Sequence, residues 1–415
     1  MAAKKLQAPR GTFDVLPEDG QRRRELLRRT GSVLGRYGYR PFETPVFEDT
    51  DLFARGVGES TDIVRKEMFT FEDRGGRSLT LRPEGTAGVA RAYVEHGMHK
   101  LPQPVKVWYA GPFFRHERAQ AGRYRQFSQI GVEALGSDDP SVDAECILLL
   151  SELLEAAGVH EVQLKLASLG SLDARAAYLD KLRGYLRDNE SRLSEDVASR
   201  IDANPLRAFD ADHEGTKEVM AGAPRLLDSL SGEDADHFAE VRTLLDDAGV
   251  SYDVDPTLVR GLDYYTRTVF EFASAKLGAQ SGVGGGGRYD GLVGQLGGPE
   301  TPGVGWAAGV ERILLASEGN LGGFPAPVFV AIADGGTRRE AFRLVTALRE
   351  AGVRAEVEQA GRSLKGQLKH ADRLSAKAVA IVGDGGLEWK DMKTGEQRQV
   401  SNVLEAVRIA VGVDA

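Results

Sequence analysis

The spacing of apolar residues predicts a helix near the start of the chain and strands after it. Over residues 17–37, apolar side chains recur three and four positions apart beneath an arginine-rich outer face, as in an amphipathic helix. Pro41 and Pro45 end this pattern. Apolar and polar residues then alternate as in strands, in the segments 79–81, 105–109, 126–135 and 162–166. This part of the chain is therefore expected to be rich in sheet.

The pattern returns to helical spacing over residues 171–250, which predicts a helical insertion. Sheet-like segments resume at Tyr252 and include 268–272, the glycine cluster 282–287 and the strand-to-helix stretch GVGWAAGVERILLA. We therefore expect a core domain built from two parts of the chain, 1–170 and 251–322, on either side of the insertion.

A linker rich in glycine and proline, residues 319–327, precedes a different pattern. Strands and helices alternate beyond it: strands are expected at 328–333, 353–358 and 377–383, and helices at 336–351 and 363–374. This predicts a separate small α/β domain over residues 326–415.

Composition places the chain among soluble globular proteins. Of its 415 residues, 41% are hydrophobic and 28% charged, and no run of about 18 apolar residues or secretory leader is visible. We expect a cytoplasmic location and no membrane contact. The single cysteine, Cys146, excludes an internal disulfide and every C-x-x-C site, and the seven histidines show no H-E-x-x-H spacing. No protein-held metal is expected.

Charge is distributed unevenly along the chain. The formal net charge is -9, but the segment from Pro325 onward carries +2 and the rest -11, so a polyanion would need local basic patches. One candidate patch is a series of basic residues at three- and four-residue steps, which a helix would place along one side. A stripe that contacts phosphates and an ordinary solvated face fit this pattern equally well. The series is Arg362, Lys365, Lys369 and Arg373.

The densest polar cluster, residues 111–133, has the pattern of a hairpin with a charged loop at 116–123. On its returning strand, Gln129, Gly131 and Glu133 share one face, because side chains two apart point the same way. A glycine between an amide and a carboxylate is expected to leave room for a ligand. A salt-bridged edge strand explains this pattern equally well.

Two further segments, LRPEGT at 81–86 and LVRGLDYY at 258–265, are polar where core strands would be apolar. Arginine in the second suits phosphate, since it stays charged and presents a planar fork of donors. The glycines at 282–287 formally satisfy G-x-G-x-x-G, but no βαβ unit or following acidic residue accompanies them, so a dinucleotide site is rejected. A close approach of backbone to substrate, with Tyr289 beyond it, is expected instead.

Taken together, these segments resemble class II aminoacyl-tRNA synthetases. The first helix with the strand ending at Pro45 resembles motif 1, GPFFRHE with its returning strand resembles motif 2, and GVGWAAGVERI resembles motif 3. LVRGLDYYTRTVFEF and GGGGRYDGL resemble the histidine-specific motifs of histidyl-tRNA synthetases. The likeness spans nearly the whole chain. It implies an α+β fold: an antiparallel sheet flanked by helices, a helical insertion and a C-terminal α/β anticodon-binding domain.

The resemblance also implies a reaction and its partners. L-histidine would be activated by ATP, accompanied by Mg²⁺, to histidyl-adenylate with release of pyrophosphate. The histidyl group would then pass to the 3'-terminal ribose of tRNA(His). A homodimer formed through the motif 1 region is implied as well.

Site residues follow from the resemblance position by position. Arg115 and Arg260 would be catalytic and would bind ATP together with Arg123 and Arg312. Glu133 and Tyr265 would bind the imidazole nitrogens. The full set implied for histidine is Glu84, Gly85, Thr86, Gln129, Glu133, Tyr264, Tyr265 and Tyr289, of which Glu84, Thr86 and Gln129 would hold the α-amino group. The residues implied for tRNA are Arg118, Gln120, Arg362, Lys365, Lys369 and Arg373.

The chain differs from many members of the family at two positions of motif 2, and one other class of protein shares much of its pattern. Ser128 stands where many relatives carry histidine, and Ala119 where many carry proline, which bears on contacts with the tRNA acceptor end. A non-catalytic paralogue, such as the regulatory subunit of ATP phosphoribosyltransferase, would lack the C-terminal domain and an intact arginine motif. Arg260 and the last ninety or so residues are both present, which favours the enzyme.

Overall fold

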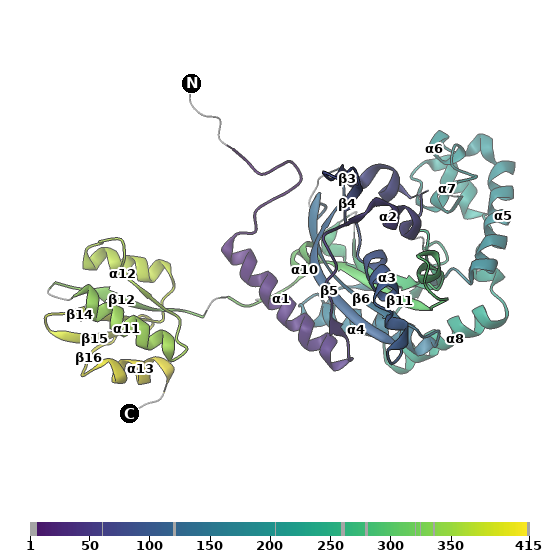
Figure 1. The fold of residues 1–415 in the computed structure, drawn as a ribbon. Helices are drawn as coiled ribbons and strands as arrows, with labels where there is room; N and C mark the ends of the chain where they lie inside the picture. The colour runs from purple at the N-terminus through teal and green to yellow at the C-terminus, as the bar shows by residue number, and fades with distance from the viewer. Residues whose placement is uncertain are drawn as a thin grey trace, which may run out of the picture. The chain divides into compact units, whose positions relative to one another are not determined.

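The computed structural model describes residues 6–59, 61–118, 122–203, 205–258, 262–278, 281–319, 321–323, 325–334 and 337–412. The chain divides into two units, Met1–Leu321 and Gly322–Ala415, each with its own sheet (Figure 1). Among the described residues, no helix combines the length and the apolar character needed to cross a bilayer.

An eight-stranded sheet forms the centre of the first unit. Its order is β1-β5-β6-β11-β10-β9-β7-β8, and every pairing from β5 to β7 is antiparallel, whereas β1 and β8 join the edges in parallel. The expected antiparallel sheet is therefore confirmed. The strands are β1 (Arg40–Pro41), β5 (Val105–Phe114), β6 (Gln126–Leu135), β7 (Gln163–Ser168), β8 (Asp253–Val254), β9 (Thr266–Ala273), β10 (Gly282–Arg288) and β11 (Gly303–Gly309).

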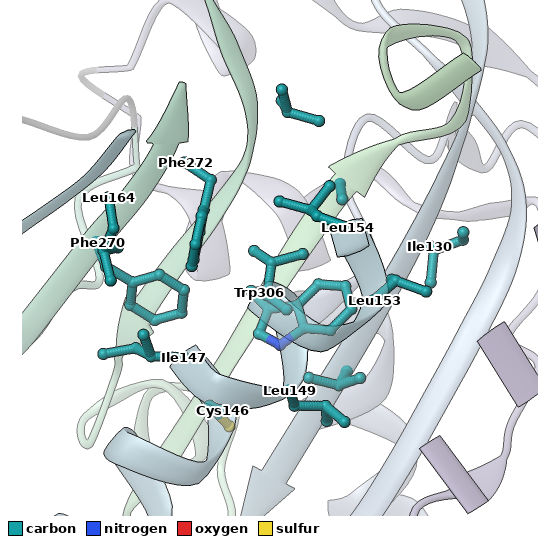
Figure 2. Close-up of a cluster of buried hydrophobic side chains, with 14 of the residues drawn as sticks. Ile130, Cys146, Ile147, Leu149, Leu153, Leu154, Leu164, Phe270, Phe272 and Trp306 are labelled. Carbon is teal, nitrogen blue, oxygen red and sulfur yellow. The ribbon is translucent and has the colours of Figure 1, made fainter. Parts of the chain in front are cut away.

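One face of this sheet is sealed by apolar packing. Trp306 on β11 lies beside Leu153 and Leu154 of α4 (Pro140–Ala156), and Phe270 on β9 lies beside Ile147 of the same helix (Figure 2). All of these side chains are almost completely buried. Burying a large apolar side chain contributes about 1.5–3 kcal/mol. Because side chains alternate along a strand, the next residue on each strand points to the opposite face, where the polar residues of the site lie. Three more helices contribute to this core: α1 (Pro17–Arg36), α8 (Gly232–Asp247) and α10 (Val310–Ala316).

The first unit also contains a second, smaller group of strands and helices. It contains an antiparallel three-stranded sheet of order β2-β4-β3 and the helix α3, whose first turn belongs to the site. Its elements are β2 (Phe47–Asp49), α2 (Thr50–Val57), the π-helix η1 (Ile63–Glu67), β3 (Phe69–Glu72), β4 (Ser78–Leu81), α3 (Thr86–Glu95) and η2 (Met98–Lys100). The short η6 (Ala275–Leu277) and α9 (Leu292–Gln295) lie between later strands.

The helical insertion predicted from the sequence is confirmed. Ser171 and Ser194 cap two of its helices, since their hydroxyls accept from the amides of Ala174 and Val197. Leu182 and Leu186 on α5 are completely buried within it. Its elements before α8 are α5 (Leu172–Asp188), η3 (Glu190–Arg192), α6 (Glu195–Ala198), η4 (Pro205–Asp210), α7 (Glu214–Ala221) and η5 (Leu227–Ser229).

The second unit is a five-stranded sheet of order β13-β12-β14-β15-β16 with three helices. Its first half follows the predicted alternation, and α11 starts with a capping box formed by Thr337 and Glu340. The final hairpin and helix were not predicted. The elements are β12 (Val328–Ile332), α11 (Arg338–Glu350), β13 (Ala355–Val357), α12 (Leu364–Arg373), β14 (Ala378–Gly383), β15 (Gly386–Asp391), β16 (Gln397–Val400) and α13 (Val403–Val411).

Candidate active site

The space above Gly131 on β6 is filled by protein. In the sheet register Tyr109 of β5 lies opposite Gly131. A Cβ atom at Gly131 would fall 2.3 Å from Cζ of Tyr109, and one at Gly85 would fall 2.4 Å from the same atom. The expectation that Gly131 leaves room for a ligand was therefore wrong. The two glycines accommodate the ring of Tyr109. This contact could not be predicted without the pairing of β5 with β6.

Glu133 is the centre of the polar face. Its carboxyl is almost completely buried and accepts hydrogen bonds from the hydroxyls of Thr86 (2.7 Å), Tyr109 (3.1 Å) and Tyr289. Burial raises the pKa of Glu133 to about 8, and the hydroxyl groups oppose that shift. The site therefore holds a carboxyl group that changes protonation near neutral pH.

A second buried carboxyl, Glu84, lies at the start of α3. It accepts from the backbone amides of Thr86 (2.8 Å) and Ala87 (2.9 Å), and the hydroxyl of Tyr264 lies 3.4 Å away. Burial raises the pKa of Glu84, while these amides and the charge of Arg115 oppose the shift. A carboxylate at a helix N-terminus is also favoured by the helix dipole. Two acidic groups thus face the same polar region.

Tyr264, Tyr265 and Tyr289 pack against one another beside these two carboxyl groups. The ring centroids of Tyr264 and Tyr265 are 4.9 Å apart, and those of Tyr264 and Tyr289 are 5.7 Å apart. All three side chains are buried. Glycine is required beside them, because a Cβ at Gly287 would fall 3.0 Å from the Tyr265 ring and one at Gly305 only 2.0 Å from Oε2 of Glu133.

The glycine run 282–287 forms the inner strand β10, which pairs with β9 and β11 in antiparallel fashion. A dinucleotide fingerprint would need a strand followed by a phosphate-binding turn and a helix. Rejection of that motif is confirmed. The glycines allow β10 to pack closely against its neighbouring strands β9 and β11.

Gln129 has an unused acceptor. Its Oε1 atom is buried and has no hydrogen-bond partner among the described residues. Buried polar atoms in folded proteins are nearly always bonded, so this oxygen is suited to receive a donor from a bound molecule.

The arginines of motif 2 and motif 3 gather near Glu117. Arg115 donates through Nε to the carbonyl of Pro83 (2.9 Å), and its Nη1 lies 3.9 Å from Glu117. Arg123 pairs with Glu117 at 3.1 Å. Burial and the nearby charge of Arg123 lower the pKa of Arg312. Glu67 lies close to this group as well. Guanidinium groups stay charged and present several donors, which suits a polyphosphate.

Some of the residues predicted for ATP and tRNA do not lie in this polar region or are not described by the structure. Arg260, Gln120 and Ala119 lie outside the described residues. Arg118 is described and exposed. Among the described residues, no group of three histidine, cysteine, aspartate or glutamate side chains is placed to hold a metal ion.

The basic series in the second unit differs from its predicted arrangement. Arg362 precedes α12 and pairs with Glu358 at 3.2 Å, so its expected place on the helix was wrong. Lys365, Lys369 and Arg373 are exposed on α12 at four-residue steps. Lys365 and Lys369 also line a cavity of about 510 Å³, together with Leu364, Leu368, Asp372 and Met392.

Sequence reasoning missed two supports of the site. Arg288, the residue before Tyr289, forms a completely buried ion pair with Asp143 of α4. Glu311 accepts from the backbone amide of Ser128 and from Arg23 of α1, which also donates to the Ser128 hydroxyl. The departure at Ser128 thus takes part in a link between the three motif segments. Neither support has a local signal, because each joins residues more than 100 positions apart.

Comparison with known proteins identifies the relatives of both units. Residues 11–313 match the family described as histidyl-tRNA synthetase, and residues 327–408 match the anticodon binding domain. A curated protein called histidine–tRNA ligase, from Desulforamulus reducens, is 48% identical over 402 residues, which cover 95% of this chain and 96% of the relative. Another with the same name, from Rubrobacter xylanophilus, is 48% identical over 407 residues and covers 95% and 96%.

Solved structures give the same result for the fold. The apo histidyl-tRNA synthetase of S. aureus has a TM-score of 0.81 and 36% identity, covering 99% of this chain and 100% of that one. A Bacillus halodurans protein described as an ATP phosphoribosyltransferase regulatory subunit/histidyl-tRNA synthetase has a TM-score of 0.67 and covers 92% and 99%. At 22% identity, the second shows the fold alone.

The sheet, the insertion and the separate terminal domain are those of a class II aminoacyl-tRNA synthetase, a ligase that joins an amino acid to a tRNA. Within that class, the chain belongs to the histidyl-tRNA synthetase family.

Replacing Glu133 by glutamine should change how stability depends on pH. The pKa of Glu133 is raised to about 8, so the folded protein keeps a proton there that the unfolded chain releases near pH 4.5. Raising the pH from about 5 to 8 therefore lowers the free energy of unfolding, by a contribution on the order of a few kcal/mol. Urea unfolding at several pH values should show a smaller loss in Glu133→Gln than in the parent.

The exposed Glu240→Gln variant, on α8, is the matched control and should follow the parent. A Glu133→Gln profile parallel to the parent profile would contradict the proposed ionisation of the buried carboxyl.

Proposed function

We propose that the chain is a cytosolic enzyme that activates L-histidine with ATP and transfers the histidyl group to tRNA(His). The observation that carries this proposal is the buried Glu133 carboxyl, surrounded by hydroxyls and tyrosine rings in a chain of the histidyl-tRNA synthetase family. A site of this kind supplies fixed hydrogen-bonding groups in a space largely shielded from water.

Glu133 and Tyr265 would recognise the imidazole. A neutral imidazole has one donor and one acceptor nitrogen, so a carboxyl oxygen of Glu133 can accept from the donor nitrogen and the hydroxyl of Tyr265 can donate to the acceptor nitrogen. Tyr264 and Tyr289 would line the ring faces. A site that bonds both nitrogens rejects isosteres lacking them by about 10⁴- to 10⁵-fold, without an editing domain.

Glu84, Thr86 and Gln129 would hold the α-amino group, with Gly85 beside them. The unused Oε1 of Gln129 can accept from the ammonium, and Glu84 adds a negative charge at the start of α3. Gly85 must stay without a side chain because the Tyr109 ring lies against it. These groups would fix the amino end while the carboxylate turns toward ATP.

Arg115, Arg123, Arg260 and Arg312 would bind ATP, which would enter with Mg²⁺. Activation is an in-line attack of the histidine carboxylate oxygen on the α-phosphorus. The bond from that phosphorus to the bridging oxygen breaks, and pyrophosphate leaves. Such a step needs alignment and neutralisation of charge more than proton transfer. Arg115 and Arg260 are therefore proposed as the catalytic residues, in contact with the reacting phosphate.

We assign tRNA binding to Arg118 and Gln120 in the motif 2 loop and to the second unit. There, Lys365, Lys369 and Arg373 would contact phosphates from α12, and Arg362 would do so from the preceding loop. The domain limits proposed are 1–170 and 251–322 for the catalytic core, 171–250 for the insertion and 326–415 for the anticodon-binding domain.

A homodimer is proposed through the motif 1 region. Val46, Phe47 and Phe71 are 36%, 50% and 44% exposed. Val46 directly precedes β2, Phe47 lies on β2 and Phe71 on β3, the two strands that flank β4, and the two phenylalanine centroids are 6.3 Å apart. Exposed apolar clusters of this kind often mark interfaces. A second copy of the chain would cover this one.

Pyrophosphate exchange tested with each of the twenty amino acids should proceed with histidine and stay at background with the other nineteen. Radiolabel moving from pyrophosphate into ATP is the measurement. Binding of histidine without exchange would instead favour a regulatory protein. Faster exchange with another amino acid would overturn the specificity proposed here.

A chain ending at Leu321 should keep exchange and lose charging of tRNA. The two units have separate cores, so the first retains its site, while the proposed anticodon contacts are removed. Exchange and aminoacylation rates would be compared with those of the full chain. Equal loss of both activities, with the shortened protein still folded, would contradict this division of labour.

Replacing Phe47 and Phe71 by aspartate should yield a monomer, since buried unpaired charges would oppose contact between the two copies. Sedimentation velocity at micromolar concentration is the measurement. Leu315→Asp, at a residue 56% exposed elsewhere on the first unit, is the control and should remain dimeric. A dimer unchanged by the double substitution would place the interface on another surface.

A further inference from the structure

The backbone around Tyr264 is held by an arginine from the helical insertion. Arg175, in the first turn of α5, donates through Nη1 to the carbonyl oxygens of Asp263 (2.6 Å) and Tyr265 (2.8 Å). One guanidinium nitrogen therefore bridges the residues on either side of Tyr264. Tyr264 in turn contacts the rings of Tyr265 and Tyr289.

This arrangement is unusual for a charged group. Burial lowers the pKa of Arg175, and its Nε atom has no hydrogen-bond partner among the described residues. The negative charge of Asp263 opposes this shift, and the guanidinium is bonded to backbone carbonyls in place of water. We therefore explain the position of Arg175 by its two hydrogen bonds to the backbone around Tyr264, and not by a general contribution to the stability of the fold.

The insertion also holds the far end of the same segment. Arg267 has a φ of 43°, a left-handed conformation that costs a non-glycine residue about 1–3 kcal/mol. Its Nε donates to Asp234 of α8 at 3.1 Å, and Asp234 also accepts from the amide of Ser171 at the start of α5. Residues 263–267 are thus fixed from two helices of the insertion.

Apolar packing does not fill the space beside Arg175. A cavity of about 280 Å³ lies between α5 and the segment it holds, and Asp263 forms part of its wall. The rings of Tyr264 and Tyr265 pack in an apolar cluster, and the hydrogen bonds of Arg175 add a fixed position for the backbone beside this cavity. Lining residues include Leu172, Arg175, Leu179, Arg183, Leu206 and Asp263.

We infer that Arg175 is a positioning residue for the amino-acid pocket: it holds the backbone on both sides of Tyr264 and so fixes the two tyrosines against the substrate side chain. The inference rests on the proposed function, because the pocket concerned is the one assigned to histidine. Its action is through Tyr264 and Tyr265, and it does not itself contact substrate.

The test compares Arg175→Met and Arg175→Lys with the parent in pyrophosphate exchange, varying histidine and ATP separately. Methionine keeps the apolar stem and removes the donors. It should raise the KM for histidine about tenfold, the effect of losing roughly one charge-assisted hydrogen bond, and leave the KM for ATP within about twofold. Lysine, which can still donate to a carbonyl, should recover part of the loss.

Arg183→Met is the matched control, since Arg183 lies two turns further along α5, lines the same cavity and pairs with Asp180. Its kinetics should equal those of the parent. A second check is Tyr264→Phe: combined with Arg175→Met, its effect on the KM for histidine should be less than additive, since both changes act through one ring.

An unchanged KM for histidine in Arg175→Met would overturn the inference. A parallel rise in both KM values, or a loss confined to thermal stability with no recovery by lysine, would overturn it by showing a purely structural role. If the methionine variant fails to fold, the lysine variant decides by the same split. Histidine exchange by the parent protein tests the proposed function separately, so failure of one is distinguishable from failure of the other.

Discussion

Burying the Glu133 carboxyl on the face of a β-sheet is the constraint on which the rest of the site depends. An isolated buried carboxylate is costly, and its cost is reduced here by hydroxyls from Thr86, Tyr109 and Tyr289. Those three come from α3, β5 and the end of β10, so the elements must meet at one place. The packed opposite face of the sheet, with Trp306 at its centre, supplies the rigidity that such a meeting requires.

The glycines have a clear purpose in this setting. Gly85 and Gly131 admit the ring of Tyr109, and Gly305 admits the carboxyl of Glu133. Removing a side chain from the floor lets polar groups from neighbouring strands converge without separating the strands. The proposed contribution of Arg175 extends the same requirement outward, because tyrosines around a small ligand must be held as firmly as the floor below them.

Local pattern was enough to predict many of the elements, whereas the fold class followed from the likeness of several motifs taken together, and the final hairpin and helix were not predicted. Alternation in 126–135 and helical spacing from Pro17 agree closely with β6 and α1, and the sequence motifs indicated the antiparallel sheet. Contacts between distant segments could not be predicted in this way. Tyr109 opposite Gly131, Arg23 on Glu311 and Arg175 on Tyr265 each depend on strand register or on the packing of the insertion, which a single sequence does not encode locally.

The arrangement of Arg362 illustrates the same limit on a smaller scale. Its spacing from Lys365 matched one side of a helix, but Ser363 caps α12, so the helix starts after Arg362. Spacing alone places charges on a face only where the helix continues, and the capping hydroxyl determines where it begins.

The most direct measurement is a crystal structure of the protein with histidine and ATP bound. One imidazole nitrogen should lie within hydrogen-bond distance of the Glu133 carboxyl and the other near the Tyr265 hydroxyl, with Arg115 against the α-phosphate. Histidine bound elsewhere, or Glu133 and Tyr265 directed away from its ring, would contradict the assignment of this buried carboxyl as the amino-acid recognition group.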